Sequence, residues 1–148
     1  MLKDIVDILE KAKVEIQSNL EQKGINASGR TSASFHVETY PNGARLVMGG
    51  EKTAPLQTLE VGRPGGNVPK GFTAILEQWS RDKGIPFNTD RERRTFAYFL
   101  GKRIKEEGTL RNKAHVDVYS SVVTKAAEQI KKDIVVSMTA FIHSGFIK

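Results

Sequence analysis

The chain contains no cysteine, which excludes a disulfide framework, a thiolate metal site and a cysteine nucleophile. It also lacks any run of the ~20 apolar residues that a membrane span requires. Its first residues, MLKDIVDILEKAKVEIQ, interleave charged and apolar residues where a signal peptide has an unbroken apolar stretch. Three histidines, His36, His115 and His143, lie far apart and have no second ligand at helical spacing. We therefore expect no membrane, metal or cofactor partner, and a protein made in the cytoplasm.

The remaining composition is that of an ordinary globular protein. With 148 residues, the chain is long enough to bury about 70% of its unfolded surface, and we expect a single domain over residues 1–148. The net charge of +6 suits an anionic partner. Residues of both signs are nevertheless scattered along the chain rather than gathered in a basic tail, so composition alone gives weak support for nucleic-acid binding.

The spacing of apolar residues predicts four helices and a hairpin. Steps of three and four residues predict long terminal helices over 4–22 and 120–142, and two middle helices over 72–84 and 89–108. Period-two alternation predicts a strand over 31–40, and the turn Pro41-Asn42-Gly43 returns the chain along 44–48. We therefore expect an α+β fold, in which a small antiparallel sheet (the hairpin plus short strands) is packed by the terminal and middle helices. Sheet surface that these helices leave open would be covered by another subunit.

A glycine-rich stretch, LEVGRPGGNVPKG, runs from Leu59 to Gly71 and raises the question of phosphate binding. A P-loop requires a Ser or Thr directly after its lysine, but Lys70 is followed by Gly71. The glycine spacing also departs from the dinucleotide-binding fingerprint, and no serine lies in a Gly-x-Ser-x-Gly nucleophile elbow. We expect no catalytic residue and no enzyme activity. A hydrolase that uses Glu60 as an acid or base ranks third among the functions considered.

The predicted helix over 89–108 has a basic face opposite its apolar residues, formed by Arg91, Arg94, Lys102 and Lys105. Lysine and arginine neutralise phosphates without reading sequence, so this face suits the backbone of DNA. A small nonspecific nucleic-acid-binding domain is therefore the alternative function. A solvated helix face is the other interpretation of the same pattern, and no helix-turn-helix, zinc finger or aromatic RNA-binding motif accompanies it.

Arg103 is predicted on the apolar side of the same helix, where an arginine is costly unless it meets a carboxylate. Glu60 is a candidate partner, because it is an acid in an otherwise apolar and glycine-rich context, and Arg63 competes with Arg103 for it. We consider a structural ion pair between Glu60 and Arg103 that fixes the glycine-rich stretch to the helix. The alternative is that the Arg103 side chain extends to solvent.

Several motifs occur in an order that resembles a known family. After the N-terminal helix comes GRTSAS at Gly29–Ser34, then the hairpin, then LEVGRPG, then a helix with Trp79 that ends in KGI at Lys83–Ile85. An aromatic-rich helix leads into IKEEGT at Ile104–Thr109, and a C-terminal helix follows. Over nearly its whole length the chain resembles the head-tail joining, tail-completion and tail-terminator proteins of tailed bacteriophages.

The resemblance implies a structural protein of the virion neck or tail, assembled in the host cytoplasm, without catalysis. It implies a homo-oligomeric ring that joins the tail to the DNA-filled head, with partners on the portal or adaptor side and on the tail-tube side. The glycine-rich stretch would then contact a neighbouring subunit or ring, through Glu60, Gly62, Arg63, Pro64, Gly65, Gly66 and Lys70. Arg91, Arg94, Lys102 and Lys105 would face DNA in the ring lumen.

Overall fold

The computed structural model describes residues 1–49, 56–109 and 117–146, with the backbone alone at residues 56, 57, 145 and 146. Within these ranges six helices and two strands follow one another: α1 (Leu2–Gln22), α2 (Arg30–Ala33), β1 (His36–Tyr40), β2 (Gly43–Val47), α3 (Leu56–Val61), α4 (Phe72–Asp82), α5 (Asp90–Glu107) and α6 (Ser120–Phe146). The predicted α+β fold, with a small antiparallel sheet and long terminal helices, is confirmed.

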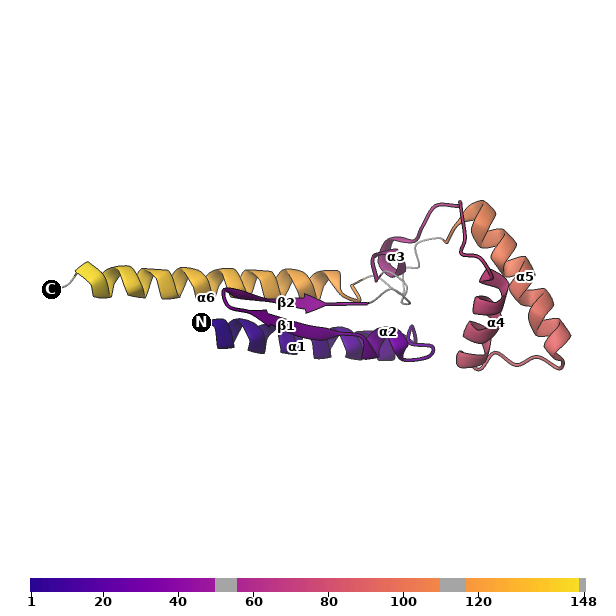
Figure 1. Cartoon of the computed structure of the whole chain (residues 1–148), viewed down its shortest axis with the longest axis horizontal. Helices are drawn as coiled ribbons and strands as arrows, with labels where there is room; N and C mark the ends of the chain where they lie inside the picture. The colour runs from indigo at the N-terminus through magenta and orange to yellow at the C-terminus, as the bar shows by residue number, and fades with distance from the viewer. Residues whose placement is uncertain (50–55, 110–116, 147–148) are drawn as a thin grey trace.

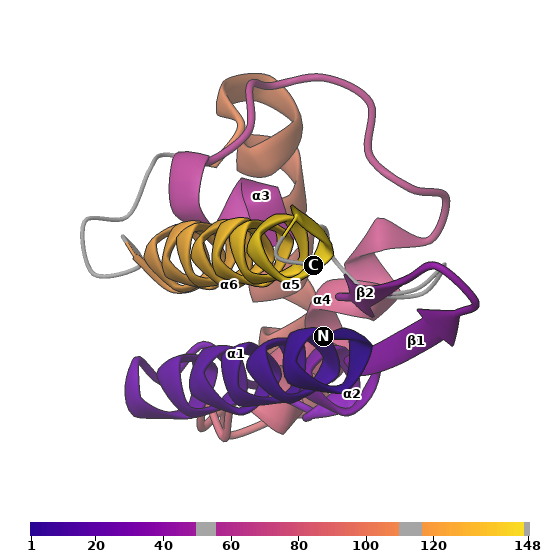
Figure 2. The same cartoon turned by 90° about the vertical axis from the view of Figure 1, so that its left-hand side faces the viewer.

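The body of the molecule consists of α1, β1, β2 and α6. The two long helices lie side by side in opposite directions, and the hairpin lies along them (Figures 1 and 2). Ala12, Ile16 and Leu20 recur every four residues on α1, so they share one face and are buried. They form the core together with Phe35, Val118 and Val122, which come from segments far apart in sequence.

The hairpin has the predicted antiparallel pairing, in which His36 lies opposite Val47 and Tyr40 opposite Gly43. However, the strand does not begin where the alternation suggested, because residues 30–33 form the short helix α2. Small polar side chains at this helix form local hydrogen bonds rather than bonds across a sheet. Ser34, directly after α2, donates from Oγ to the carbonyl oxygen of Thr31 at 2.6 Å. In the described ranges, the only strand pairing outside the hairpin is an isolated bridge between Arg63 and Thr109.

The arm consists of α4 and α5, two antiparallel helices at the other end of the molecule (Figure 1). Ala97 and Gly101, four residues apart on α5, are buried against α4. Small residues there allow a close approach: a side chain at Gly101 would begin 3.4 Å from Leu76 Cδ1. The arm is therefore packed through a narrow face, and larger side chains on its helices remain at the surface.

The start of α5 follows the predicted capping pattern. Thr89 Oγ1 accepts a hydrogen bond from the backbone N–H of Glu92 at 3.2 Å. The Glu92 carboxylate reaches back to the N–H of Asn88 at 3.0 Å, one residue before the expected position. These bonds satisfy amides that the helix itself leaves unpaired.

Arm and body meet across a cleft of about 260 Å³. Ile75 and Trp79 line it from α4, and Leu20 and Ile25 line it from the body. Two polar contacts cross the cleft. Lys83 Nζ donates to the carbonyl oxygen of Gly24, and Arg30 pairs with Asp82 at 3.7 Å. Trp79 is 36% exposed, so the cleft leaves the side chain partly open to solvent.

Candidate functional site

The first residues of the glycine-rich stretch belong to α3, and the irregular loop runs from Gly62 to Gly71. This loop crosses the C-terminal end of α5. The backbones of Arg63 and Thr109 exchange two hydrogen bonds, of 3.0 and 2.9 Å, and the N–H of Gly66 donates to the carbonyl oxygen of Lys105 at 2.8 Å. The Arg63 guanidinium donates to the carbonyl oxygen of Asn67 at 2.9 Å and so closes the loop on itself.

Two glycines make this crossing sterically feasible. A Cβ atom at Gly65 would lie 2.3 Å from the carbonyl oxygen of Glu106, and one at Gly108 would lie 2.1 Å from the carbonyl oxygen of Arg63. Gly108 also has φ 79° and ψ −159°, a combination that is essentially restricted to glycine. The glycines therefore shape an intramolecular crossing that attaches the arm to α3 and thereby to the body.

Glu60 connects α3 to the start of α6. Its side chain is buried, and Oε1 accepts hydrogen bonds from the backbone N–H groups of Tyr119 at 2.7 Å and Ser120 at 3.1 Å. A negative charge at a helix N-terminus is favourable because the unpaired amides there carry partial positive charge. Burial raises the pKa of Glu60, but these backbone hydrogen bonds outweigh it and leave the pKa below its ordinary value.

The predicted ion pair between Glu60 and Arg103 is therefore wrong. Arg103 Nε pairs with Glu107 Oε2, one turn further along α5, at 2.9 Å, and its side chain is 71% exposed. A solvated pair within one helix costs little desolvation, which explains why the arginine extends to solvent rather than to a buried acid. The carboxylate of Glu60 is buried inside the chain, which gives no support to the prediction that Glu60 lies at a subunit interface.

The other predicted interface residues of the loop remain accessible in part. Pro64, Gly65, Gly66 and Lys70 are exposed, and Gly62 and Arg63 are half-buried. Their contact with a neighbouring subunit stays a prediction. Gly65 is explained by the crossing, and Gly62 and Gly66 by their positive φ of 75° and 150°, so the glycine content gives no separate support for such a contact.

The predicted basic face of α5 is partly neutralised. Arg94 Nε pairs with Glu77 at 3.3 Å, and Lys102 pairs with Glu106 at 4.0 Å. Within the described ranges, Arg91 and Lys105 make no ion pair. These two lie near opposite ends of α5, about 20 Å apart along its axis. The face therefore offers two separate free charges rather than a continuous basic stripe.

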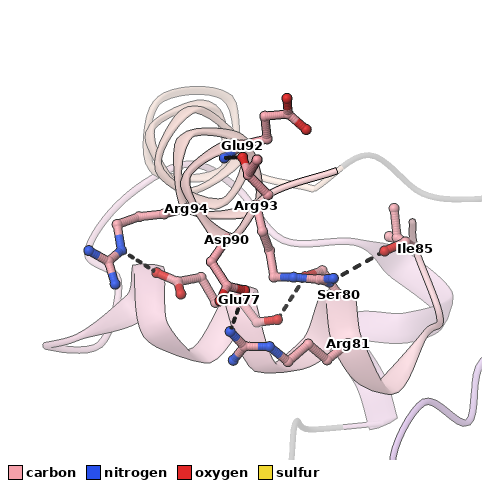
Figure 3. A network of polar contacts seen from close by, with 9 residues as sticks. Glu77, Ser80, Arg81, Ile85, Asp90, Glu92, Arg93 and Arg94 are labelled. Atoms are coloured by element: carbon pink, nitrogen blue, oxygen red, sulfur yellow. Dashed lines mark hydrogen bonds and ion pairs between the residues drawn. The ribbon is translucent and has the colours of Figure 1, made fainter. Parts of the chain in front are cut away.

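Arg93 is a structural residue that the sequence reasoning missed (Figure 3). Its Nη1 donates to Ser80 Oγ at 3.0 Å and to the carbonyl oxygen of Ile85 at 3.3 Å, while the guanidinium stacks over Phe87 at 4.9 Å. The signal was its spacing, because Arg93 stands four residues before Ala97 and eight before Gly101, on the face that packs against α4. Arg93 thus fixes α4, α5 and the turn between them.

The described residues contain no group of three His, Asp or Glu side chains placed to hold a metal ion. His36 lies in the hairpin and His143 near the end of α6, and His115 lies outside the described residues. None of the described helices combines the length and apolarity needed to cross a bilayer. Glu60, the one acid considered for catalysis, is occupied as a helix cap.

The accessible surface of the chain is unusually large and includes a group of hydrophobic side chains. The accessible surface is 10621 Å², whereas a compact monomer of 16.4 kDa exposes about 7,500 Å². Among the described residues, large hydrophobic side chains are exposed on every long helix, and four of those on α6 share one face of its C-terminal part: Val135, Met138, Phe141 and Ile142. Single exposed hydrophobic residues are normal, but a contiguous group marks an interaction surface.

Comparison with known proteins gives no relative. The sequence matches no family model, and no curated protein and no solved structure matches it. The resemblance to phage head-tail proteins remains a prediction.

Proposed function

We propose that the chain is a structural virion protein of a tailed bacteriophage, forming an oligomeric ring in the neck or at the tail end that joins the tail to the DNA-filled head. The observation that carries the assembly part of this proposal is the surface excess. About 3,000 Å² is exposed beyond that of a compact monomer, which is within the range that obligate assemblies bury at their interfaces. The motif order described above supports the phage assignment.

The sheet supports the same proposal. Two-stranded sheets are marginal in water, and an unpaired edge is a template for another strand. β1 pairs with β2 only, so each strand has one edge without a partner strand in the described ranges. Neighbours in a ring can cover both edges, because a closed head-to-tail ring gives each subunit two different neighbours.

The elongated shape suits a ring of such contacts. Body and arm lie at opposite ends of the molecule (Figure 1), so each subunit presents distant surfaces to its two neighbours. The glycine-rich loop lies near the arm and has an exposed proline and lysine, Pro64 and Lys70. In this proposal the loop contacts the neighbouring subunit or the next ring without taking part in chemistry.

The first test is the state of association of the purified chain. Mass photometry and negative-stain electron microscopy at micromolar concentration are expected to show one discrete oligomer with ring-shaped views. Mass spectrometry of purified particles from the phage that encodes the chain is expected to find it in the virion. A strictly monomeric protein that is absent from particles would contradict the proposal.

A salt titration separates this function from the nucleic-acid-binding alternative. A dedicated DNA binder loses affinity steeply as salt rises. Its binding releases cations from the DNA phosphates, and this release is less favourable at high salt. The net charge of +6 favours the alternative. The ion pairs of Arg94 and Lys102 weaken it, since two of the four predicted phosphate contacts already have acidic partners. We expect little binding to a 30-base-pair duplex at 150 mM salt, together with an unchanged oligomer.

A further inference from the structure

The C-terminal part of α6 extends beyond the rest of the body. The helices α1 and α6 run in opposite directions, and Asn19 near the end of α1 donates to the carbonyl oxygen of Val118 just before α6. At the other end, Asp4 and Asp133 line the same groove. Residues 134–144, here called the overhang, therefore continue past the N-terminus of α1, as Figure 1 shows.

One side of the overhang has the pattern of a helix that packs against a core. Apolar residues stand at i, i+1, i+4, i+7 and i+8, which places them on a single face: Ile134, Val135, Met138, Phe141 and Ile142. Four of them are 51–78% exposed, with Phe141 the most exposed. This apolar face has no partner among the described residues, although its pattern is that of a buried one.

Two polar side chains of the overhang form hydrogen bonds within the helix itself. Thr139 Oγ1 donates to the carbonyl oxygen of Val135 at 2.8 Å, and Ser144 Oγ donates to that of Phe141 at 2.9 Å. Both hydroxyls are thus satisfied within the helix and lose no hydrogen bond to water when a partner covers them. Covering these two hydroxyls therefore carries little desolvation cost.

The charge pattern favours a second copy of the chain as the occupant. Between Asp133 and Lys148 the sequence has no Asp, Glu, Lys or Arg. Because no side of the overhang carries Asp, Glu, Lys or Arg, one overhang can lie against another without charge repulsion, whereas it offers no ion pair to a nucleic acid or a charged protein partner. Its eleven residues span about 16 Å of helix, roughly half the thickness of a bilayer core, so it is too short for a membrane span.

We propose that the overhangs of successive subunits pack side by side and form the apolar centre of the contact that closes the ring. The contact is head-to-tail. The apolar face of one overhang lies against the opposite side of the next, where Val136 and Ala140 present smaller side chains. This arrangement rests on the ring proposed above and specifies the surface through which its subunits contact one another.

The exposed apolar area of the overhang is large enough for the centre of an interface between subunits but not for the whole of it. The exposed parts of the apolar face correspond to roughly 400 Å² per copy, and matching area on the neighbour gives about half of a standard interface of ~1,600 Å². The body next to the overhang supplies the rest. Buried apolar clusters of this kind carry most of the binding energy of an interface, while the surrounding contacts exclude water.

Met138→Glu and Val136→Glu test the two sides of this contact. Each change places a charge in the proposed interface, and we expect the concentration for half-assembly to rise roughly tenfold or more. The matched control is Val14→Glu on α1: Val14 is 58% exposed and Val136 is 62% exposed, and both lie within helices. Glutamate favours helix more than valine does and about as much as methionine does, so circular dichroism should show all three variants folded.

The outcomes separate this inference from the proposed function. If the wild type forms a ring and Met138→Glu assembles as well as the wild type, the overhang contact is wrong and the ring stands. If Val136→Glu assembles normally while Met138→Glu does not, the head-to-tail packing is wrong. An equal loss with Val14→Glu also overturns the inference, whereas a monomeric wild type at 100 µM overturns the ring itself.

Discussion

In the body, segments far apart in the sequence bury six hydrophobic residues against one another, whereas the arm buries Leu76 and Ala97 together with the polar residue Ser80. The arm therefore depends on the geometry of hydrogen bonds and stacking around Arg93, and the body on apolar area. Loss of a single hydrogen-bonding group disrupts the contacts of the arm, whereas the body loses stability in proportion to the apolar area removed.

The two regions also differ in charge. From residue 62 to 109 the arm and its loop carry ten Lys or Arg against six Asp or Glu, whereas the described body, residues 1–49 and 117–146, carries nine of each. The apolar overhang belongs to the neutral region. Salt should thus affect contacts made by the arm more than those made by the overhang, because screening acts on charges and not on apolar area.

The largest effect is expected from Gly108→Ala, which acts on the link between the two regions. The added methyl group would meet the carbonyl oxygen of Arg63, and the backbone angles at position 108 disfavour alanine. We expect a loss of about 3 kcal/mol in the free energy of unfolding, with faster hydrogen exchange in α3 and α5. Gly43→Ala is the control, since a Cβ at Gly43 meets nothing within 4 Å. Equal stability of the two variants would contradict the close crossing.

Removal of the Glu60 carboxylate should weaken the body by a smaller amount. Glu60→Ala leaves the N–H groups of Tyr119 and Ser120 without their acceptor, at a cost of about 2 kcal/mol in urea unfolding. Glu60→Gln keeps an acceptor and should lose less. Glu106→Ala is the control, because its side chain is 60% exposed. A Glu60→Ala variant as stable as the control would show that the cap is not needed.

The Glu60 effect has a definite pH dependence. The pKa of Glu60 is lower in the folded chain than its ordinary value of 4.5. Its contribution to stability is therefore fully present above pH 4.5 and is lost as the pH falls through the lower, folded pKa. The stability difference between wild type and Glu60→Gln should shrink over that range, and a constant difference would contradict a charged cap.

Arg93→Ala should destabilise the arm alone. It removes hydrogen bonds to Ser80 and Ile85 and the stacking on Phe87, and we expect a loss of about 2 kcal/mol. Trp79 is the only tryptophan and lies on α4, so its fluorescence reports unfolding of the arm while circular dichroism reports the whole chain. Arg91→Ala, two residues earlier, is the control and should leave the fluorescence transition unchanged.

The sequence predicted well those elements whose signals are local. The long helices, the Thr89 cap and the hairpin turn are specified by nearby residues, and the structure has them. It predicted less well what depends on partners distant in sequence. Phe99 stands at helical spacing with the other apolar residues of α5 but is 61% exposed, because α4 packs on the small residues Ala97 and Gly101 instead. The Glu60 cap joins residues about 60 positions apart, which periodicity does not reveal.

The smallest effect concerns the solvent side of the hairpin, where Glu38 meets three partners. Hydrogen bonds from Tyr40, Arg45 and His36 hold the pKa of Glu38 at about 2. The pKa of His36 is in turn raised, first by its hydrogen bond to the carbonyl oxygen of Ser34 and then by Glu38. His36 therefore favours the folded state below its ordinary pKa of 6.5, and this contribution disappears as the pH rises through the raised value.

An NMR titration of the His36 ring, in wild type and Glu38→Gln, checks this network. We expect the midpoint in the wild type to lie above 6.5. It should move down in Glu38→Gln but remain somewhat raised, because the Ser34 carbonyl still accepts from Nδ1 at 2.9 Å. The change in thermal stability should be small, since exposed charge pairs contribute little. An unchanged midpoint would mean that solvent screens Glu38 from His36, and that this face of the body, unlike the arm, carries no organised polar network.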